Sequence, residues 1–431
     1  MVRRLLIIYF FVQAYSIALH AQTPDTLRVQ LDRANRLSWN DKVKDAQRGY
    51  LQILQATPQN AEARKNLGRV TSWLGRHREA QKILKDYLKD FPNDTEARFW
   101  YAQSLSWMGR SDRAVAEAYH ILTVDSNYNE ATKLIAEINK NTRSQTVVDY
   151  SRSTQSDNLD IHNYQVDQNF NWNYNRTSLG LRFQKTDYVL EDKVDKVNAY
   201  RPFLLGRHRF SDATEWNVWL SEQFLNSNNE QFRFFLYDTW FTIWPNDLLR
   251  FDISSSRKIF DNYRSLVLGV TAYTAGLSAD ITPTDKLKLS LRSSRWWYSD
   301  DNKMTWLQSE LGYRIINKPQ TTLSGRYTNF NFEKQLNNGY FNPLNFHAAD
   351  VRLQSWSFFG KWLLEADGSF GREWEPLANS VKPMGNITLK VGRVLGNRVY
   401  MEARLQRFDS RISNEFGFSR TTGGLKLEYK W

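Results

Sequence analysis

The spacing of apolar residues along the chain changes near residue 145. Before this point, apolar residues recur every three or four positions, which predicts amphipathic helices. From Gln145 onward, apolar and polar residues alternate in segments of about ten residues, separated by Asn, Asp, Gly and Pro, which predicts strands. The pattern therefore predicts an α + β two-domain protein, with a helical domain over residues 22–141 and a β domain over residues 145–431.

The helical region repeats itself with a period of 34 residues. The residues that recur at this offset are Trp39, Trp73 and Trp107; Ala46, Ala80 and Ala114; Leu54, Leu88 and Leu122; Glu62, Glu96 and Glu130; and Pro58 and Pro92. A fixed period of this length is typical of an array of helical pairs, and the prolines fall where a helix has to end. We expect three repeats, over about residues 27–60, 61–94 and 95–128, followed by a capping helix over about residues 129–140.

The period and the small residues of this region resemble those of tetratricopeptide (TPR) repeats. The resemblance implies a scaffold that binds partners rather than a catalyst. It also implies that Trp39, Trp73 and Trp107 lie near the ends of the first helices, on the concave side of the array, where their rings would bind sugars or a partner peptide. Packing between successive repeats is the alternative role for this column of tryptophans.

In the β region, the alternation gives each segment one apolar face and one polar face. Leu287, Leu289 and Leu291, for example, alternate with Lys288 and Ser290. In a soluble sandwich the apolar face points inward, whereas in a transmembrane barrel it faces lipid and the polar face lines a lumen. The alternation by itself is compatible with both folds.

Three further features favour the transmembrane barrel. Aromatic residues cluster at the ends of segments, as in Trp240 with Trp244 and in residues 296–298, which is where the girdles at a membrane interface lie. The last residues, 425–431, alternate and end on an aromatic, and they resemble the C-terminal strand of bacterial outer-membrane barrels. An export signal at the N-terminus is compatible with an outer membrane. We therefore expect an antiparallel transmembrane β-barrel.

Counting the alternating segments predicts about sixteen strands. They start near residues 146, 164, 176, 197, 215, 231, 247, 263, 286, 304, 320, 350, 362, 384, 398 and 416. Short turns alternate with longer connections, of which the longest runs over residues 333–349. Because bacterial barrels carry their short turns on the periplasmic side, we expect the helical domain to lie in the periplasm.

The N-terminus has the pattern of a secretory signal peptide. Arg3 and Arg4 precede an apolar run over residues 5–19, and Ala21 is a suitable cleavage position. We expect residues 1–21 to be removed on export. The alternative is a membrane anchor, for which the apolar run is short because a spanning helix needs about 20 apolar residues.

Composition narrows the classes of function further. The chain has 431 residues, a net charge of +12, 14% aromatic residues, no cysteine and a mean hydropathy of −0.61. The aromatic content argues against intrinsic disorder, and the absence of cysteine excludes disulfides, thiolate metal sites and cysteine nucleophiles. The basic residues are spread over alternating strands rather than gathered in one tract, which argues against a nucleic-acid partner.

The sequence lacks the motifs of the common catalytic classes. It contains no H-E-x-x-H, no G-x-S-x-G, no P-loop and no dinucleotide fingerprint, and its six histidines are scattered. We therefore expect no enzyme activity, no cofactor and no metal site. The alternative is a hydrolytic site in the barrel that uses His208 or His347 with a nearby serine.

A TPR domain followed by a barrel resembles a group of exopolysaccharide-export proteins. The group comprises the cellulose-export and poly-N-acetylglucosamine-export outer-membrane subunits and the YaiO-type barrels. The sharpest local match consists of Gly339, Tyr340, Phe341, Asn342 and Pro343, which look like the G-Y-[FY]-[SN]-P motif of the cellulose-export barrel. Three repeats are fewer than the export subunits carry, and this number is closer to the YaiO-type proteins.

The resemblance implies an outer-membrane channel that exports an exopolysaccharide. Its TPR domain would bind periplasmic or inner-membrane proteins of glycan synthesis, and its barrel would lie in outer-membrane lipid. The alternative is an outer-membrane anchor that transports nothing and whose TPR domain scaffolds envelope proteins. Comparing these two hypotheses requires knowing what lines the barrel.

Six basic residues on the polar faces of the strands are candidates to line the lumen. They are Lys288, Arg292, Arg326, Arg352, Lys390 and Arg404. If these cations are free, the lumen favours an anionic or partly acidic glycan. The alternative is a structural network in which each cation pairs with an acidic residue such as Glu402.

Overall fold

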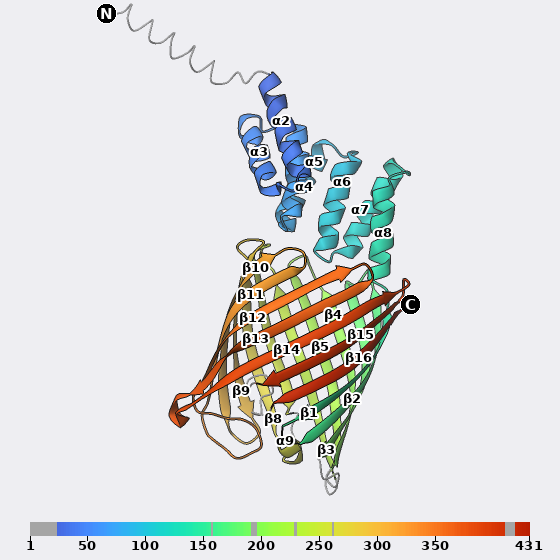
Figure 1. The fold of residues 1–431 in the computed structure, drawn as a ribbon. Helices are drawn as coiled ribbons and strands as arrows, with labels where there is room; N and C mark the ends of the chain where they lie inside the picture. The colour runs from blue at the N-terminus through green and yellow to red at the C-terminus, as the bar shows by residue number, and fades with distance from the viewer. Residues whose placement is uncertain (1–23, 157, 191–195, 228–230, 261–262, 410–418) are drawn as a thin grey trace, which may run out of the picture. The chain divides into compact units, whose positions relative to one another are not determined.

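The computed structural model describes residues 24–156, 158–190, 196–227, 231–260, 263–409 and 419–431 (Figure 1). The predicted signal peptide, residues 1–21, lies outside the described residues. The chain divides into two units, one mainly helical and one built mainly from strands. Among the described helices, none has the length and the apolar content needed to cross a membrane.

In the described residues before the first strand there are seven helices, most of which form antiparallel pairs; the division between the two units falls within the last of them. They are α2 (Pro24–Trp39), α3 (Val43–Ala56), α4 (Ala61–Trp73), α5 (His77–Asp90), α6 (Thr95–Trp107), α7 (Ser111–Val124) and α8 (Asn129–Asn141). The first six helices give three pairs at the predicted spacing of 34 residues, and α8 follows them as the predicted seventh helix. The prediction of three helical repeats is confirmed.

Local chemistry sets where the helices of each pair begin and end. Asn60 caps α4 by accepting a hydrogen bond from the amide of Ala63 at 2.9 Å, and Asp94 caps α6 in the same way through Ala97. These two caps stand 34 residues apart. The turns after α4 and α6 contain Gly75 and Gly109, whose φ angles of 80° and 71° favour glycine.

Close contact between helices accounts for the columns of small residues in the repeats. Ala46, Ala80 and Ala114 are all fully buried. At Gly68 a Cβ would lie 2.5 Å from Leu84 of α5, so a larger side chain would push the two helices apart. The small residues therefore allow α4 and α5 to approach closely.

The carboxylate of Asp94 is expected to make the helical unit sensitive to acid. Burial alone would raise the pKa of Asp94, but the amide of Ala97, the hydroxyl of Tyr87 and the ammonium of Lys65 stabilise the charged form and hold this pKa below its usual value. A lowered pKa in the folded state adds stability above the unfolded-state value of about 4, and this stability is lost as the pH falls through the folded-state pKa.

Asp94→Asn removes the charge of this cap and keeps its hydrogen-bond acceptor. Asn60 caps the equivalent helix of the preceding repeat in this way. We expect the variant to lower the stability of the helical unit by roughly 1 kcal/mol at neutral pH and to flatten its loss of stability below pH ~4. Urea unfolding followed by the helical circular-dichroism signal at several pH values measures both effects. An unchanged pH profile would show that the carboxylate of Asp94 is not the sensitive group.

The strands of the second unit form one closed antiparallel barrel, so the predicted antiparallel β-barrel is confirmed (Figure 1). In the described residues there are sixteen, the predicted number: β1 (Gln145–Gln155), β2 (Leu159–Trp172), β3 (Thr177–Leu190), β4 (Lys196–Arg209), β5 (Thr214–Asn226), β6 (Gln231–Ile243), β7 (Leu249–Ile259), β8 (Thr271–Ile281), β9 (Leu287–Tyr298), β10 (Lys303–Ile316), β11 (Gln320–Phe332), β12 (Phe346–Phe359), β13 (Trp362–Glu375), β14 (Ser380–Leu395), β15 (Val399–Asp409) and β16 (Arg420–Lys430). Pairing between β1 and β16 closes the barrel.

Side chains alternate between the outer and inner surfaces of the barrel. Leu291, Leu311 and Val351 are exposed on the outside, whereas Ser290 and Ser324 of neighbouring positions are buried inside. An apolar exterior with a polar interior is the surface pattern of a barrel that lies in lipid. The alternation predicted from sequence is thus explained by an outward-facing apolar row and an inward-facing polar row on each strand.

The connections differ in length at the two ends of the barrel. At one end, short turns such as residues 173–176 and 360–361 join the strands, and Gln145 of β1 lies beside Lys430 of β16 at this same end. The longest described connection, residues 333–345, lies at the opposite end. The two ends are called the short-turn end and the long-loop end below.

One predicted strand start, near residue 263, is wrong. The structure has a short helix there, α9 (Tyr263–Val267), and the strand β8 begins at Thr271. The reason is that Leu266, Val267 and Leu268 are apolar in succession, so the segment does not alternate. The longest connection was also predicted to reach residue 349, whereas β12 begins at Phe346. The predicted connections over residues 191–196, 227–231 and 410–415 lie largely outside the described residues.

Candidate functional site

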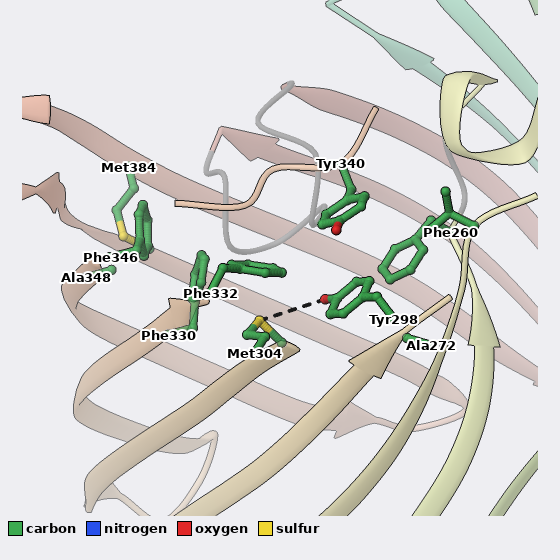
Figure 2. Close-up of a cluster of buried hydrophobic side chains, with 11 residues drawn as sticks. Phe260, Ala272, Tyr298, Met304, Phe330, Phe332, Tyr340, Phe346, Ala348 and Met384 are labelled. Atoms are coloured by element: carbon green, nitrogen blue, oxygen red, sulfur yellow. Dashed lines mark hydrogen bonds between the residues drawn. The ribbon is translucent and has the colours of Figure 1, made fainter. Parts of the chain in front are cut away.

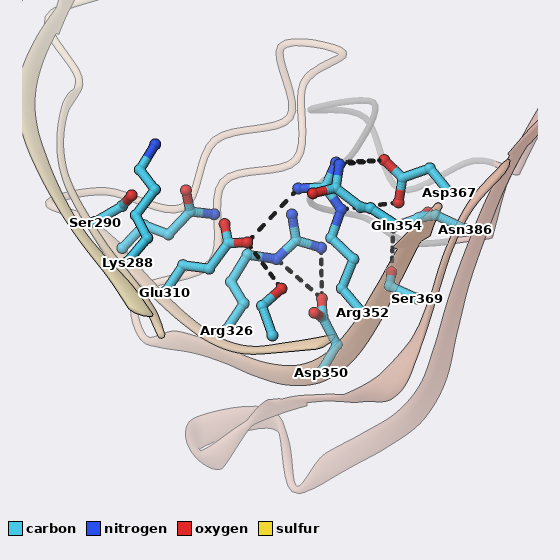
Figure 3. Close-up of polar contacts among 12 residues, drawn as sticks. Lys288, Ser290, Glu310, Arg326, Asp350, Arg352, Gln354, Asp367, Ser369 and Asn386 are labelled. Atoms are coloured by element: carbon cyan, nitrogen blue, oxygen red, sulfur yellow. Dashed lines mark hydrogen bonds and ion pairs between the residues drawn. The ribbon is translucent and has the colours of Figure 1, made fainter. Parts of the chain in front are cut away.

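All six predicted lumen cations face the interior of the barrel, where most of them pair with carboxylates. Arg326 and Arg352 lie at the centre of one network (Figure 3). The guanidinium of Arg326 donates to Asp350 at 2.5 Å through Nη2. Arg352 donates to Asp367 at 2.8 Å through Nε and lies 3.8 Å from Glu310. Strands β10 to β13 thus contribute opposite charges to one continuous network.

Three further cations have carboxylate partners on neighbouring or nearby strands. Lys288 lies 3.1 Å from Asp280, and Lys390 lies 3.0 Å from Glu365. Arg404 of β15 forms a double hydrogen bond with Asp149 of β1, with both distances at 2.6 Å. These three cations, like Arg326 and Arg352, are therefore paired with acidic residues in a structural network and are not free.

Arg292 differs from the other five. Its guanidinium donates to the neutral amide of Gln308 at 3.2 Å, and among the described residues no carboxylate pairs with it. Its side chain is exposed to the lumen. The lumen wall is therefore polar and mixed in charge, with Arg292 as a cation that other molecules can reach.

The motif from Gly339 to Pro343 lies in the longest connection, and its side chains pack against the inner barrel wall (Figure 2). The ring of Tyr340 stacks on Tyr298 of β9 at 4.8 Å between centroids and on Phe260 at 5.6 Å. Phe341 packs edge-on against Phe330 of β11 at 6.0 Å. Tyr340 is only 6% exposed, so it is an internal residue rather than a surface residue of an outer loop.

Polar contacts hold this 333–345 loop in place. The hydroxyl of Tyr340 donates to Asp300 at 2.8 Å and accepts from Asn302 at 3.1 Å. Burial raises the pKa of the Tyr340 hydroxyl, and the nearby Asp300 raises it further, so the hydroxyl stays a donor. Asn302 also bonds both the amide and the carbonyl of Lys334. Asn342 closes the loop on itself through Leu336.

A second apolar cluster lies at the long-loop end, around α9. Leu266 of α9 packs with Leu159, Tyr188 and Leu225 from the inner faces of β2, β3 and β5. The hydroxyl of Ser265 donates to the carbonyl of Asn338 at 3.2 Å, which joins α9 to the 333–345 loop. These two segments therefore narrow the lumen at the long-loop end.

In the helical unit, the column of predicted binding tryptophans splits into two environments. Trp39 is 66% exposed and meets the half-buried Trp73 edge-on at 5.9 Å. Trp107 is also exposed, and its ring lies tilted beside that of His77, with 5.3 Å between centroids. The guanidinium of Arg69 lies over the rings of both Trp39 and Trp73, at 4.6 and 5.2 Å. Trp73 therefore packs between repeats, while Trp39 and Trp107 keep free ring surface.

The structure corrects the assignment of the aromatic clusters to interface girdles. In residues 296–298, only Trp297 points outward, while Trp296 and Tyr298 point into the barrel. Trp240 also points inward, where it packs against Trp219. Strand alternation requires this because consecutive side chains alternate between faces, so an aromatic run cannot lie wholly in one girdle. Whether a residue stands at an odd or an even position along its strand identifies the tryptophans that point inward.

The two histidines considered for catalysis do not face the lumen. His208 and His347 occupy outward positions on β4 and β12, and their Nδ1 atoms bond the hydroxyls of Thr177 and Tyr327 at 2.9 and 2.7 Å. In the part of the chain that the structure describes, no group of three or more histidine, aspartate or glutamate side chains is placed to hold a metal ion.

Comparisons with known proteins agree with this architecture. The family model described as tetratricopeptide repeat matches residues 40–96 and 74–138, so the N-terminal region carries TPR repeats. The solved structure of a bacterial polysaccharide outer membrane secretin matches with a TM-score of 0.54 and 12% identity, covering 67% of this chain and 99% of that chain. At this identity the match shows a shared fold. No curated protein matches the sequence.

Two other solved structures match a smaller share of the chain. The first TPR of Spaghetti (RPAP3) bound to an HSP90 peptide is 17% identical, covering 28% of this chain and 94% of that chain, with a TM-score of 0.26. A Thermobaculum terrenum O-GlcNAc transferase mutant is 22% identical, covering 27% of this chain and 22% of that chain, also with a TM-score of 0.26. Scores this low carry no argument about fold or function.

Proposed function

We propose that this protein is an outer-membrane channel for export of an exopolysaccharide, rather than an enzyme. The observation that carries the proposal is the closed barrel, whose interior is lined by polar and charged side chains apart from the apolar clusters at the long-loop end. Sixteen-stranded barrels are wide enough for an aqueous channel, and mixed donors and acceptors along the wall replace the hydration of a hydroxyl-rich chain. An anchor without transport does not need a polar interior of this size.

The surface of the barrel supports a place in the outer membrane. Its outward side chains form an apolar band over much of each strand, as lipid requires. Charged pairs such as Arg152 with Asp160 and Arg233 with Glu222 lie on the outer face toward the long-loop end. Bacterial barrels carry their short turns on the periplasmic side, and β1 begins at the short-turn end. The TPR repeats that precede β1 would therefore be delivered to the periplasm.

The substrate class rests on the shared fold and on the chemistry of the wall. The protein of the same fold is a polysaccharide outer membrane secretin, which supports a polysaccharide as the cargo here. Most predicted lumen cations are neutralised by carboxylates, as for Arg326 and Arg352. A wall of paired charges favours a cargo recognised by hydrogen bonds over one recognised by net charge.

The TPR repeats are the part proposed to bind partners. TPR arrays bind peptides and proteins, and the free ring surfaces of Trp39 and Trp107 are suited to an apolar or aromatic partner side chain. The partners proposed are periplasmic or inner-membrane proteins of glycan synthesis. Docking of this kind would bring a growing glycan to the short-turn end.

Secreted polysaccharide from a strain that lacks this chain tests the proposal. We expect extracellular glycan to fall severalfold and to return with the full-length protein, but not with a version that lacks residues 23–140. Unchanged glycan output, under conditions where the strain makes glycan, would favour the non-transporting anchor instead.

A cysteine pair tests whether the glycan passes through the lumen. The native chain has no cysteine, and on β14 Thr388 faces the lumen while the adjacent Leu389 faces outward. We expect a bulky thiol-reactive reagent that cannot cross membranes to reduce export in the Thr388→Cys strain and to leave export unchanged in the Leu389→Cys strain. A scaffold that transports nothing would be insensitive at both positions.

A further inference from the structure

A cavity of about 420 Å³ lies inside the barrel, beneath the 333–345 loop. It borders the aromatic cluster of Tyr298, Phe332 and Tyr340 that Figure 2 shows. Its wall comes from the inward side chains of β6 to β11, and Tyr340 and Phe341 of the loop cover it. This volume lies within the range of roughly 300–1,000 Å³ that is usual for small-molecule sites. None of the six predicted lumen cations except Arg292 lines it.

The cavity exists because three neighbouring strands place small residues inward at the same height. Ser254 of β7, Gly276 of β8 and Ser294 of β9 are direct cross-strand neighbours. A Cβ at Gly276 would lie 2.7 Å from the hydroxyl of Ser254, so even an alanine would be crowded on this floor. In the adjacent row, Ser256 and Thr274 are hydrogen-bonded at 2.6 Å. The floor is therefore shallow and rich in hydroxyl groups.

Aromatic rings form one side of the cavity. Trp306 of β10 is the cross-strand neighbour of Ser294 on β9. In the adjacent row, Trp296 of β9 is the cross-strand neighbour of Thr274 on β8. The indole nitrogen of Trp296 donates to the hydroxyl of Ser294 at 2.8 Å, which fixes the orientation of the ring. Both tryptophans are only partly buried against the aromatic cluster under the loop, so each keeps ring surface toward the cavity.

Two charged groups that make no hydrogen bond or ion pair among the described residues, Asp238 and Lys258, face the aromatic side. The ammonium of Lys258 lies 5.3 Å from the centre of the Trp296 ring. Asp238 and Lys258 differ in this respect from the paired charges of the Arg326 and Arg352 network. Arg292 also lines the cavity. The carboxylate of Asp238 and the ammonium of Lys258 are therefore available to bond a ligand.

We propose that this cavity is a carbohydrate-binding subsite that holds pyranose units of a neutral glycan. A pyranose ring has an apolar face of C–H groups and a rim of hydroxyls. Trp296 and Trp306 provide surfaces for the apolar face, while Asp238, Lys258 and the serine hydroxyls bond the rim. The inference rests on the proposed function, since it names where the exported chain would be held in the lumen.

Calorimetric titration of the full-length protein tests this site directly. The protein is kept in a zwitterionic detergent without a sugar headgroup, and the probes are cellohexaose and chitohexaose. We expect at least one probe to bind, and we expect Trp296→Leu to weaken its binding by about tenfold, a loss of about 1.4 kcal/mol. The matched control is Trp356→Leu, because Trp356 also occupies an inward position but lies outside the cavity.

A second variant covers the possibility that Trp296→Leu disturbs the aromatic cluster. Asp238→Asn keeps the size of the side chain and removes its charge, and we expect it to weaken binding severalfold while the heat-modified gel mobility of the barrel stays unchanged. Absence of binding by both probes overturns the inference, as does equal binding by the wild type, Trp296→Leu and Asp238→Asn.

The outcome is distinguishable from failure of the proposed function. Export measured with the Thr388→Cys and Leu389→Cys strains reports passage of glycan through the lumen and does not depend on the cavity. Export with no binding at the cavity would overturn the subsite alone. Binding at the cavity with no export would keep the subsite and overturn the channel.

Discussion

Replacing residues 334–344 by a two-residue Asn-Gly turn is expected to raise the single-channel conductance of the protein severalfold. The reason is that the loop does not extend away from the barrel. The side chain of Tyr340 is only 6% exposed, and its ring stacks on Tyr298 and Phe260 inside the barrel. Without the loop, Tyr340 and Phe341 no longer cover the cavity, and α9 loses its hydrogen bond from Ser265 to Asn338. Planar-bilayer recordings of the purified protein measure the change.

The connection between β13 and β14 provides a matched control. It contains the 3₁₀ turn η1 (Pro376–Ala378), lies at the same end of the barrel, and carries Leu377, which is exposed. Replacing residues 376–379 by the same Asn-Gly turn is expected to leave the conductance unchanged, because this connection has no buried side chain in the lumen among those described. Equal conductance in the two variants would show that the 333–345 loop does not restrict the channel.

The repeats and the barrel topology were predictable because both depend on local patterns. Trp39, Trp73 and Trp107 reveal the period by themselves, since each repeat buries equivalent faces against its neighbours. The barrel follows from a period of two, because each strand needs one face for lipid and one for the lumen. Residues 263–270 were misassigned for the same reason: there the contacts of α9 with other strands, rather than a local period, decide the structure.

The arrangement inside the barrel depends on register, which sequence alone does not supply. Lys288 and Arg404 were predicted as lumen residues from parity, but their partners Asp280 and Asp149 follow only when the cross-strand neighbours are known. The same holds for the cavity, whose floor joins Ser254, Gly276 and Ser294 from three strands. The 333–345 loop was found by its motif, yet its inward fold depends on Asp300 and Asn302 of another connection.

The seam between the first and last strands is expected to be the most sensitive place in the barrel to added volume. Arg404 of β15 reaches across β16 to Asp149 of β1, and its path crosses Gly424. A Cβ at Gly424 would lie 2.8 Å from Nε of Arg404, so any side chain there displaces the guanidinium. Asp149 would then remain half-enclosed in the wall without its partner.

We therefore expect Gly424→Val to lower the free energy of unfolding by about 3 kcal/mol, the cost of breaking an ion pair largely removed from solvent. The temperature at which the folded barrel loses its compact mobility on a gel measures this loss. Gly423→Val is the control, because Gly423 precedes it on the same strand, faces outward, and has open space where a Cβ would lie. Valine at that position is expected to be neutral or slightly stabilising.

A double variant shows whether the ion pair is the cause of the loss. Arg404→Ala removes the guanidinium that Gly424→Val would displace, so adding Gly424→Val to Arg404→Ala is expected to cost much less than it does in the wild type. If Gly424→Val costs the same in both backgrounds, the loss comes from the strand itself and not from the bond to Asp149. A reduced cost would show that the loss comes from the bond between Arg404 and Asp149, which spans β16 and adds a side-chain bond to the backbone pairing of β1 with β16.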